Sequence, residues 1–236
     1  MEVRSRTPFN RYLQASLVLA LATCLLLLCW PRLRASLDYL PVDTSVALQW
    51  SGVQIPDLQR RALIARAEQS LAQHRHYRYY DGLGTLQYLR GLDSALPAAE
   101  RRAAMAASAA AAREVVALAP MKPLAWLQLA AAGSVSGERG EEIAAAFKMS
   151  AWTGRVEPPM MLLRLELGFA FRRWLDAEGL RLLQDQTLLS WDLQRQALIS
   201  RFRSGVIDYS QVAALLARSH PDILTEMEEA LDPRVL

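Results

Sequence analysis

The amino-acid sequence predicts an all-α protein in which one N-terminal transmembrane helix precedes a domain of helical hairpins. Two observations support this fold class. Residues 12–31 form an uncharged apolar stretch between Arg11 and Arg32, and roughly 20 helical residues cross a hydrocarbon core of about 30 Å. From Pro56 onward, apolar residues recur at helical spacing, and prolines and glycines divide the chain into segments of helix length.

The apolar stretch at residues 12–31 is predicted to be an uncleaved anchor. It is longer than the core of a typical signal peptide, and Trp30, Pro31 and Arg32 follow where a cleavage site would need small residues. A cleaved signal peptide is the alternative.

The charges that flank the anchor predict its orientation. Three arginines lie in the tail of residues 1–11, whereas only Arg32 and Arg34 follow the anchor closely. Basic residues favour the cytoplasmic side of a membrane. We therefore expect a basic cytoplasmic tail and a single-pass protein of the inner membrane, with the bulk of the chain in the periplasm.

Composition excludes several classes of function. The net charge is +3, and the tail, in which three arginines outnumber one glutamate, supplies most of it; the remainder is no basic footprint for nucleic acid. Both cysteines, Cys24 and Cys29, lie in the anchor, so the soluble part has neither a disulfide framework nor a thiolate metal site. Abundant alanine and only two lysines, Lys122 and Lys148, are typical of a GC-rich bacterial genome.

Residues 32–55 are predicted to be a membrane-proximal linker. Helix-breaking residues interrupt this stretch and its borders, among them Pro41, Gly52 and Pro56. A soluble α-helical domain is therefore expected at residues 56–236.

The first helices of this domain are predicted at residues 56–74, 77–92 and 97–118. Pro56 and Pro97 suit the first turn of a helix, where the missing N–H is not needed. Three glycines weaken the second segment, and a run of alanines gives the third a high helix propensity.

A helical hairpin is predicted around Trp126. Pro120 ends one helix and Pro123 begins the next, residues 133–140 form a polar turn, and residues 141–153 form the return helix. The spacing places Trp126 on the inner face of the hairpin, so we expect its side chain to be buried there.

This pattern resembles the tetratricopeptide repeat, in which a proline lies six residues before a tryptophan and a leucine three residues after it. Here these positions are Pro120, Trp126 and Leu129, while Ile143 and Phe147 resemble the small and aromatic pair of the second helix. Two departures are that Ile143 is not small and that the predicted turn is several residues too long. The resemblance covers about one and a half repeats and implies paired helices.

The most apolar soluble segment begins at Pro158 and runs to Trp174. Arg164 and Glu166 lie near its middle, and a central charge costs at least about 2.5 kcal/mol in a membrane-spanning helix. We therefore predict a central buried helix whose inner face includes Met160, Leu163, Leu167, Ala170 and Trp174. A long helix is predicted at residues 180–203. A short helix is expected to begin after the capping residue Asp208, and a last helix to run from about Pro221 to Leu231.

The sequence contains no recognisable catalytic, cofactor-binding or metal-binding motif. His74 and His76 are two residues apart and would diverge on a helix, so they are not expected to share a metal. None of the three histidines lies in a nucleophile motif, and Gly82-Leu83-Gly84 is too short for a dinucleotide loop. No cofactor and no catalytic residue are expected, although carboxylates that meet only in space would escape this reasoning.

The aromatic and basic stretch from His74 to Tyr80 is the best candidate for a binding surface. Arginine and tyrosine side chains can stack on sugars or hold acidic glycans. The alternative is that the tyrosines pack a helix junction while the arginines face water. The candidate residues are Arg75, His76, Tyr77, Arg78 and Tyr80.

Three stretches accompany the anchor: APMKPLAW at residues 119–126, MSAWTG at residues 149–154 and PPMMLLR at residues 158–164. Together they resemble a family of small accessory proteins encoded with bacterial exopolysaccharide biosynthesis systems. One anchor and a helical-hairpin domain without a catalytic signature favour a non-catalytic scaffold for protein partners. The resemblance implies a role in polysaccharide production, which makes the polysaccharide a further candidate ligand. It identifies no catalytic residue.

Two other functions stay open. One is a periplasmic assembly factor for another envelope or cytochrome complex. The other is a membrane-bound glycan-acting enzyme, which would need two carboxylates about 5 to 9.5 Å apart in a cleft. No nucleic-acid partner is expected.

Overall fold

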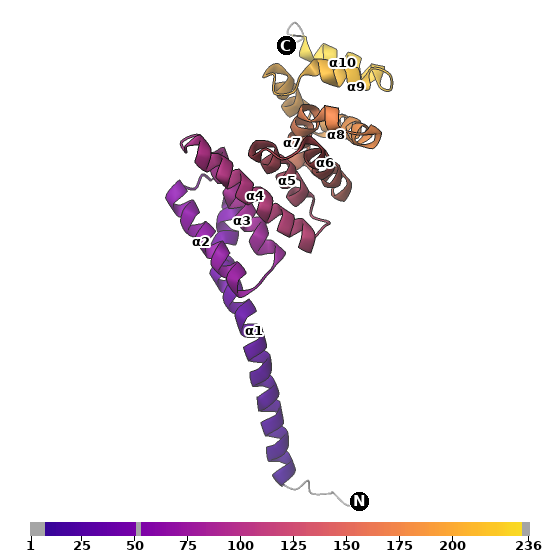
Figure 1. Ribbon diagram of the computed structural model, residues 1–236. Helices are drawn as coiled ribbons and strands as arrows, with labels where there is room; N and C mark the ends of the chain where they lie inside the picture. The colour runs from indigo at the N-terminus through magenta and orange to yellow at the C-terminus, as the bar shows by residue number, and fades with distance from the viewer. Residues whose placement is uncertain (1–7, 51–52, 233–236) are drawn as a thin grey trace, which may run out of the picture. The chain divides into compact units, whose positions relative to one another are not determined.

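The computed structural model describes residues 8–50 and 53–232 and confirms the all-α class (Figure 1). Ten α-helices and one short 3-10 helix, η1, form without any strand among these residues. Residues 1–7 of the predicted tail and Gly52 of the predicted linker lie outside them. The elements are α1 Pro8–Trp50, α2 Asp57–Gln73, α3 Tyr77–Leu92, α4 Ala98–Leu118, α5 Pro123–Ser136, α6 Gly140–Thr153, α7 Pro158–Ala170, η1 Arg172–Trp174, α8 Ala177–Arg203, α9 Tyr209–Leu216 and α10 Pro221–Leu231.

The chain divides into two compact units, with the boundary inside α3. The first unit ends at Tyr79 and includes α1 and α2, and the second begins at Tyr80. The sequence-based prediction placed the start of the soluble domain at residue 56. The observed boundary lies later in the chain, because α2 packs on α1 and belongs to the first unit.

α1 is a single helix of 43 residues, so the predicted linker is wrong for residues 32–50 (Figure 1). Pro31 and Pro41 lie inside the helix. A proline in a helix interior costs about 3 kcal/mol, because it removes one hydrogen bond and its ring clashes with the preceding turn. Burial of Ala35, Tyr39 and Val42 offsets this cost, since this part of the chain is held by packing between α1 and α2. Tertiary packing thus outweighs the local preference for a break.

The N-terminal part of α1 leaves its apolar surface uncovered. The exposed large apolar residues of this part, from Tyr12 to Trp30, each have an exposed fraction of at least 53%. Among the described residues, α1 is the one helix long and apolar enough to cross a membrane.

The second unit is built from successive helices that pack on each other, α4 on α5, α5 on α6 and α7 on α8. The turn between α5 and α6 is shorter than predicted, because α5 continues through Gly133 to Ser136. Gly137 ends α5 with a φ of 93°, a left-handed conformation that suits glycine. Most other helix boundaries agree with the sequence-based prediction to within a few residues.

The inner face of α7 differs from the predicted one. Ala170 is exposed and Trp174, in η1, is 39% exposed, whereas Met161 and Arg164 are completely buried. The prediction placed only apolar residues inside, and it therefore missed a charged one.

Arg164 is buried with four hydrogen bonds around its guanidinium group. Nε donates to the Ser150 hydroxyl at 3.0 Å and Nη2 to the Ser150 carbonyl at 2.7 Å. Nη1 donates to the Gly154 carbonyl at 2.7 Å and to Oε1 of Gln186 at 3.1 Å. These two carbonyls lie at the C-terminal end of α6, where backbone acceptors lack helical partners and the helix dipole favours a cation. Burial lowers the pKa of Arg164 to about 10, so the side chain stays charged at neutral pH.

The hydrogen bonds continue from Arg164 into neighbouring elements. The Ser150 hydroxyl donates to the Pro123 carbonyl at 2.9 Å, and the Gln186 amide donates to the Arg155 carbonyl at 2.9 Å. This network, defined by Pro123, Ser150, Gly154, Arg164 and Gln186, therefore connects α5, α6, α7 and α8. We call it the Arg164 network.

Replacing Arg164 with methionine is expected to destabilise the protein by roughly 2–4 kcal/mol, because buried acceptors left without donors cost about 1–3 kcal/mol each. Thermal unfolding of the detergent-solubilised chain, followed by circular dichroism, measures the change. Arg155→Gln is the control, since Arg155 forms an exposed ion pair with Asp185 and its loss should leave the midpoint nearly unchanged. Equal midpoints for the two variants would contradict the structural role of Arg164.

Candidate functional site

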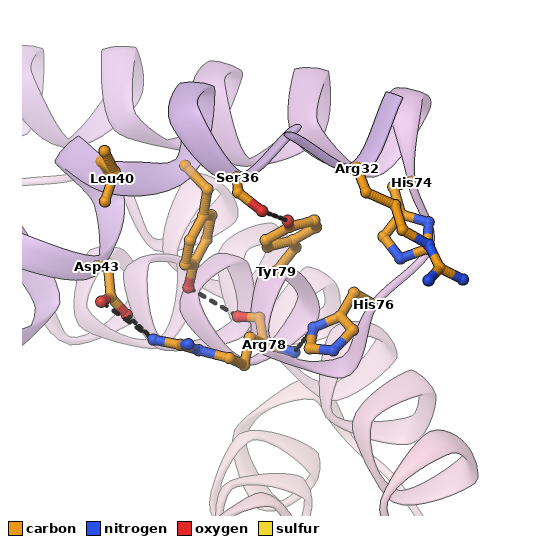
Figure 2. A pocket seen from close by; sticks show the side chains of 9 residues that line it. Arg32, Ser36, Leu40, Asp43, His74, His76, Arg78 and Tyr79 are labelled. Carbon is orange, nitrogen blue, oxygen red and sulfur yellow. Dashed lines mark hydrogen bonds and ion pairs between the residues drawn. The ribbon is translucent and has the colours of Figure 1, made fainter. Parts of the chain in front are cut away.

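The first unit contains a pocket of about 340 Å³ between α1 and the junction of α2 with α3 (Figure 2). It begins at Arg32, directly after the apolar stretch of α1. We call it the α1 pocket. It is lined by Arg32, Ser36, Tyr39, Leu40, Asp43, His74, His76, Arg78 and Tyr79.

One face of α1 supplies half of this pocket. Arg32, Ser36, Tyr39 and Asp43 are spaced by four, three and four residues, which places them on one side of a helix. The sequence-based prediction missed all four because it treated residues 32–55 as a linker. Their spacing is a helical signal that was available in the sequence.

Hydrogen bonds fix the wall of the pocket. The Tyr39 hydroxyl donates to the Arg78 carbonyl at 2.7 Å, and the hydroxyl groups of Ser36 and Tyr79 share a hydrogen bond of 3.0 Å. The rings of Tyr39 and Tyr79 pack with their centroids 4.7 Å apart. Arg78 binds both carboxylate oxygens of Asp43, at 3.0 and 3.1 Å, and this pairing raises the pKa of Arg78. The geometry of these side chains is therefore set by contacts inside the first unit.

The two histidines lie together in the pocket. The rings of His74 and His76 are stacked with their centroids 6.0 Å apart. Nδ1 of His76 accepts the backbone N–H of Arg78 at 3.3 Å, so the neutral ring carries its proton on Nε2. Burial lowers the pKa of His76, and the nearby positive charges of His74, Arg78 and Arg32 lower it further. The interior of the pocket thus disfavours an additional positive charge.

The predicted binding surface is only partly assembled here. His76 and Arg78 line the pocket, and the Tyr77 ring packs on His76 with a centroid distance of 4.7 Å. Arg75 and Tyr80 do not line it. Tyr79, which was not among the candidates, is buried and completes the wall.

The residues of the predicted hairpin, Pro120, Trp126, Leu129 and Phe147, lie in the second unit. Trp126 is half-buried, and its indole N–H donates to the Pro120 carbonyl at 2.7 Å. Trp126 and Leu129 line a groove of about 340 Å³. The expectation that Trp126 is buried between the two helices is therefore wrong, because its side chain is only partly covered by the apolar cluster of Leu127 and Ile143.

Phe147 is the fully buried aromatic residue of this hairpin. It joins the apolar cluster that contains Leu165 and Leu183, on the side of α6 that faces α7 and α8. Ile143 instead joins the cluster with Leu127 on α5. The two residues thus serve different interfaces, whereas the sequence placed both against the preceding helix.

The side chains that line the α1 pocket are mostly hydrogen-bond donors. The pocket brings guanidinium, imidazole and phenol groups together, all of which can donate hydrogen bonds to a polar or anionic ligand. Within residues 8–50 and 53–232, no group of three or more histidine, cysteine or acidic side chains is placed to hold a metal.

Comparison of the chain with models of known protein families, with curated proteins and with solved structures finds no match.

Acidification is expected to loosen the α1 pocket. The pKa of His76 is lowered from 6.5 in the folded state, so as pH falls through about 6.5 the unfolded state binds the proton first. Stability is thus present above this pH and is lost below it. The titratable and charged groups around His76 are Arg32 and Asp43 from α1 and His74 and Arg78 beside it.

Amide hydrogen exchange of residues 74–79, corrected for its intrinsic pH dependence, should be faster at pH 5.5 than at pH 7.5. His76→Gln should reduce this difference, and His220→Gln, in the second unit, should not. Exchange protection that is the same at both pH values would show that protonation of His76 does not destabilise the pocket.

Proposed function

We propose that this protein is a single-pass membrane-anchored adaptor that holds protein partners at the membrane surface. The observation that carries the proposal is the uncovered apolar part of α1. Its leucines are more than half exposed over residues 13–28, and apolar surface left in water costs about 25 cal/mol per Å². Lipid chains would remove that cost by covering the leucines in place of water. A helix is compatible with this position, because it satisfies its own backbone hydrogen bonds in a bilayer.

The proposed orientation places both units outside the cytoplasm of a bacterium. Three arginines precede the apolar stretch, Arg32 and Arg34 follow it, and the next basic residue is Arg60. This bias favours a cytoplasmic N-terminus. Absence of cysteine from the soluble part is compatible with a periplasmic location.

The architecture of the second unit supports partner binding. Stacked helix pairs present extended faces to other proteins, and Trp152 exposes 50% of its side chain on α6. Several acidic residues are paired with cations: Asp176 with Lys148, Asp185 with Arg155, and Glu166 with Arg201. A structural role for these carboxylates favours an adaptor over a hydrolytic enzyme.

The resemblance to exopolysaccharide accessory proteins favours an envelope complex that makes or exports a polysaccharide. The motifs that carry this resemblance include Pro123, Ser150, Gly154 and Arg164. All four belong to the Arg164 network. The residues that carry the resemblance therefore have a structural role, because they hold α5 to α8 together.

A C-terminal alkaline phosphatase fusion should be active in bacteria and a C-terminal green fluorescent fusion dark, because the C-terminus lies outside the cytoplasm. The opposite pair of results would contradict the orientation.

In the host, deletion of the gene should reduce polymer yield while the glycosyltransferases remain active. Arg164→Met should lower polymer yield toward that of the deletion, because it weakens the packing of α5 to α8. Conservative changes such as Asp185→Asn should leave yield nearly unchanged. If one such change abolished polymer without lowering protein level or partner capture, the protein would be an enzyme and the adaptor proposal would fail.

A further inference from the structure

The α1 pocket lies at a defined distance from the apolar stretch. Because α1 is continuous, Ser36 lies about 6 Å and Asp43 about 16 Å beyond Arg32 along the helix axis, at 1.5 Å per residue. The headgroup layer on each side of a bilayer is about 5–7 Å thick. If residues 12–31 span the membrane, as proposed above, Arg32 and Ser36 lie at headgroup depth, and the rest of the pocket lies just outside.

Positive charge in the pocket is balanced only at one end. Figure 2 shows the paired Arg78 and Asp43 at one end and Arg32, His74 and His76 at the other. Asp43 is the only carboxylate among the lining residues. Within the described part of the chain, Arg32 forms no ion pair, so one cation and two imidazoles share an end of the pocket without a counter-ion.

The free donors at this end suit an oxyanion. The guanidinium of Arg32 carries five N–H donors in a fork that matches phosphate. Nε2 of neutral His76 carries a proton, because its Nδ1 accepts from the Arg78 backbone. The hydroxyl groups of Ser36 and Tyr79 lie in the same wall, 3.0 Å from one another. A volume of about 340 Å³ is large enough for a phosphate group with a small substituent.

We propose that the α1 pocket binds the phosphate group of an anionic ligand at the membrane surface, with Arg32, His74 and His76 as its donors. The position at the membrane rests on the proposed anchoring, whereas the donor set does not. Two sources share this chemistry, an anionic lipid headgroup and a soluble phosphate.

Binding has a consequence that can be measured on the histidines. A bound anion replaces a net positive environment with a negative one, which favours the protonated imidazole. The pKa of His76, lowered in the free pocket, should therefore rise when the ligand binds. The chain has only three histidines, and His220 in the second unit is an internal reference.

The experiment is histidine NMR on the full-length chain, labelled with carbon-13 at histidine. One sample is reconstituted in phosphatidylcholine vesicles, a second in vesicles that contain 20% phosphatidate, and a third in phosphatidylcholine vesicles with inorganic phosphate added. A pH titration of each sample gives the dissociation constants of the imidazolium groups. We expect the constant of His76 to fall about tenfold in the phosphatidate sample, the inorganic phosphate sample or both, while that of His220 changes little.

Arg34 provides the matched control for surface charge. It is two residues from Arg32 on the same helix, is exposed and does not line the pocket. Arg32→Gln should abolish the effect on His76, and Arg34→Gln should preserve it. Equal effects of the two variants would show non-specific attraction to an anionic surface and would overturn the proposal.

The phosphatidate and inorganic phosphate samples distinguish a lipid headgroup from a soluble phosphate. A shift with phosphatidate alone identifies a lipid headgroup, and a saturable shift with inorganic phosphate identifies a soluble ligand. No shift of His74 or His76 in either arm overturns the pocket proposal. Flotation of the same samples tests anchoring separately: a chain that floats without a histidine shift refutes only the pocket, and a chain that stays at the bottom refutes the anchor.

Discussion

The first unit depends on α1 remaining helical beyond two prolines. A break at Pro31 or Pro41 would separate the apolar stretch from the surface that packs on α2. Because the helix continues, Tyr39 is buried and its hydroxyl reaches the Arg78 carbonyl. The same continuity aligns Arg32 with the other polar residues of the α1 pocket and sets the height of the pocket above the apolar stretch. Local helix-breaking tendency and tertiary packing oppose each other here, and packing dominates.

The two units use buried or paired arginines in different ways. Arg164 is enclosed by backbone carbonyls and neutral side chains, and its charge stabilises the end of α6. Arg78 forms a partly exposed pair with Asp43 and leaves the donors at the other end of the pocket available. The first arrangement holds helices together, and the second shapes a site. Within the described residues, unpaired donors are thus available to a ligand in the first unit, whereas the donors of Arg164 are occupied by protein acceptors.

The sequence predicted the fold class and most helices, because prolines, capping residues and apolar periodicity act locally. It identified His76 and Arg78 of the α1 pocket from their aromatic and basic surroundings. It missed the contribution of α1, since no local rule shows that burial against α2 compensates for Pro41. It also missed the inward position of Arg164, because its ligands are carbonyls from α6 that meet it only after folding. Long-range packing therefore separates what could be predicted from what could not.

The α1 pocket depends on α1 continuing as a helix past Pro41, and a distance measured across that residue tests this continuity. Leu33 and Leu48 are both about half exposed, so nitroxide labels at these positions, with Cys24 and Cys29 replaced by serine, should not disturb packing. Fifteen residues of helix separate the two sites by about 22 Å along the axis. Pulsed electron paramagnetic resonance on the full-length chain in vesicles should give one narrow distribution consistent with that helical separation. A broad distribution, or one centred well away from the helical distance, would show a hinge at Pro41 and would refute a continuous α1.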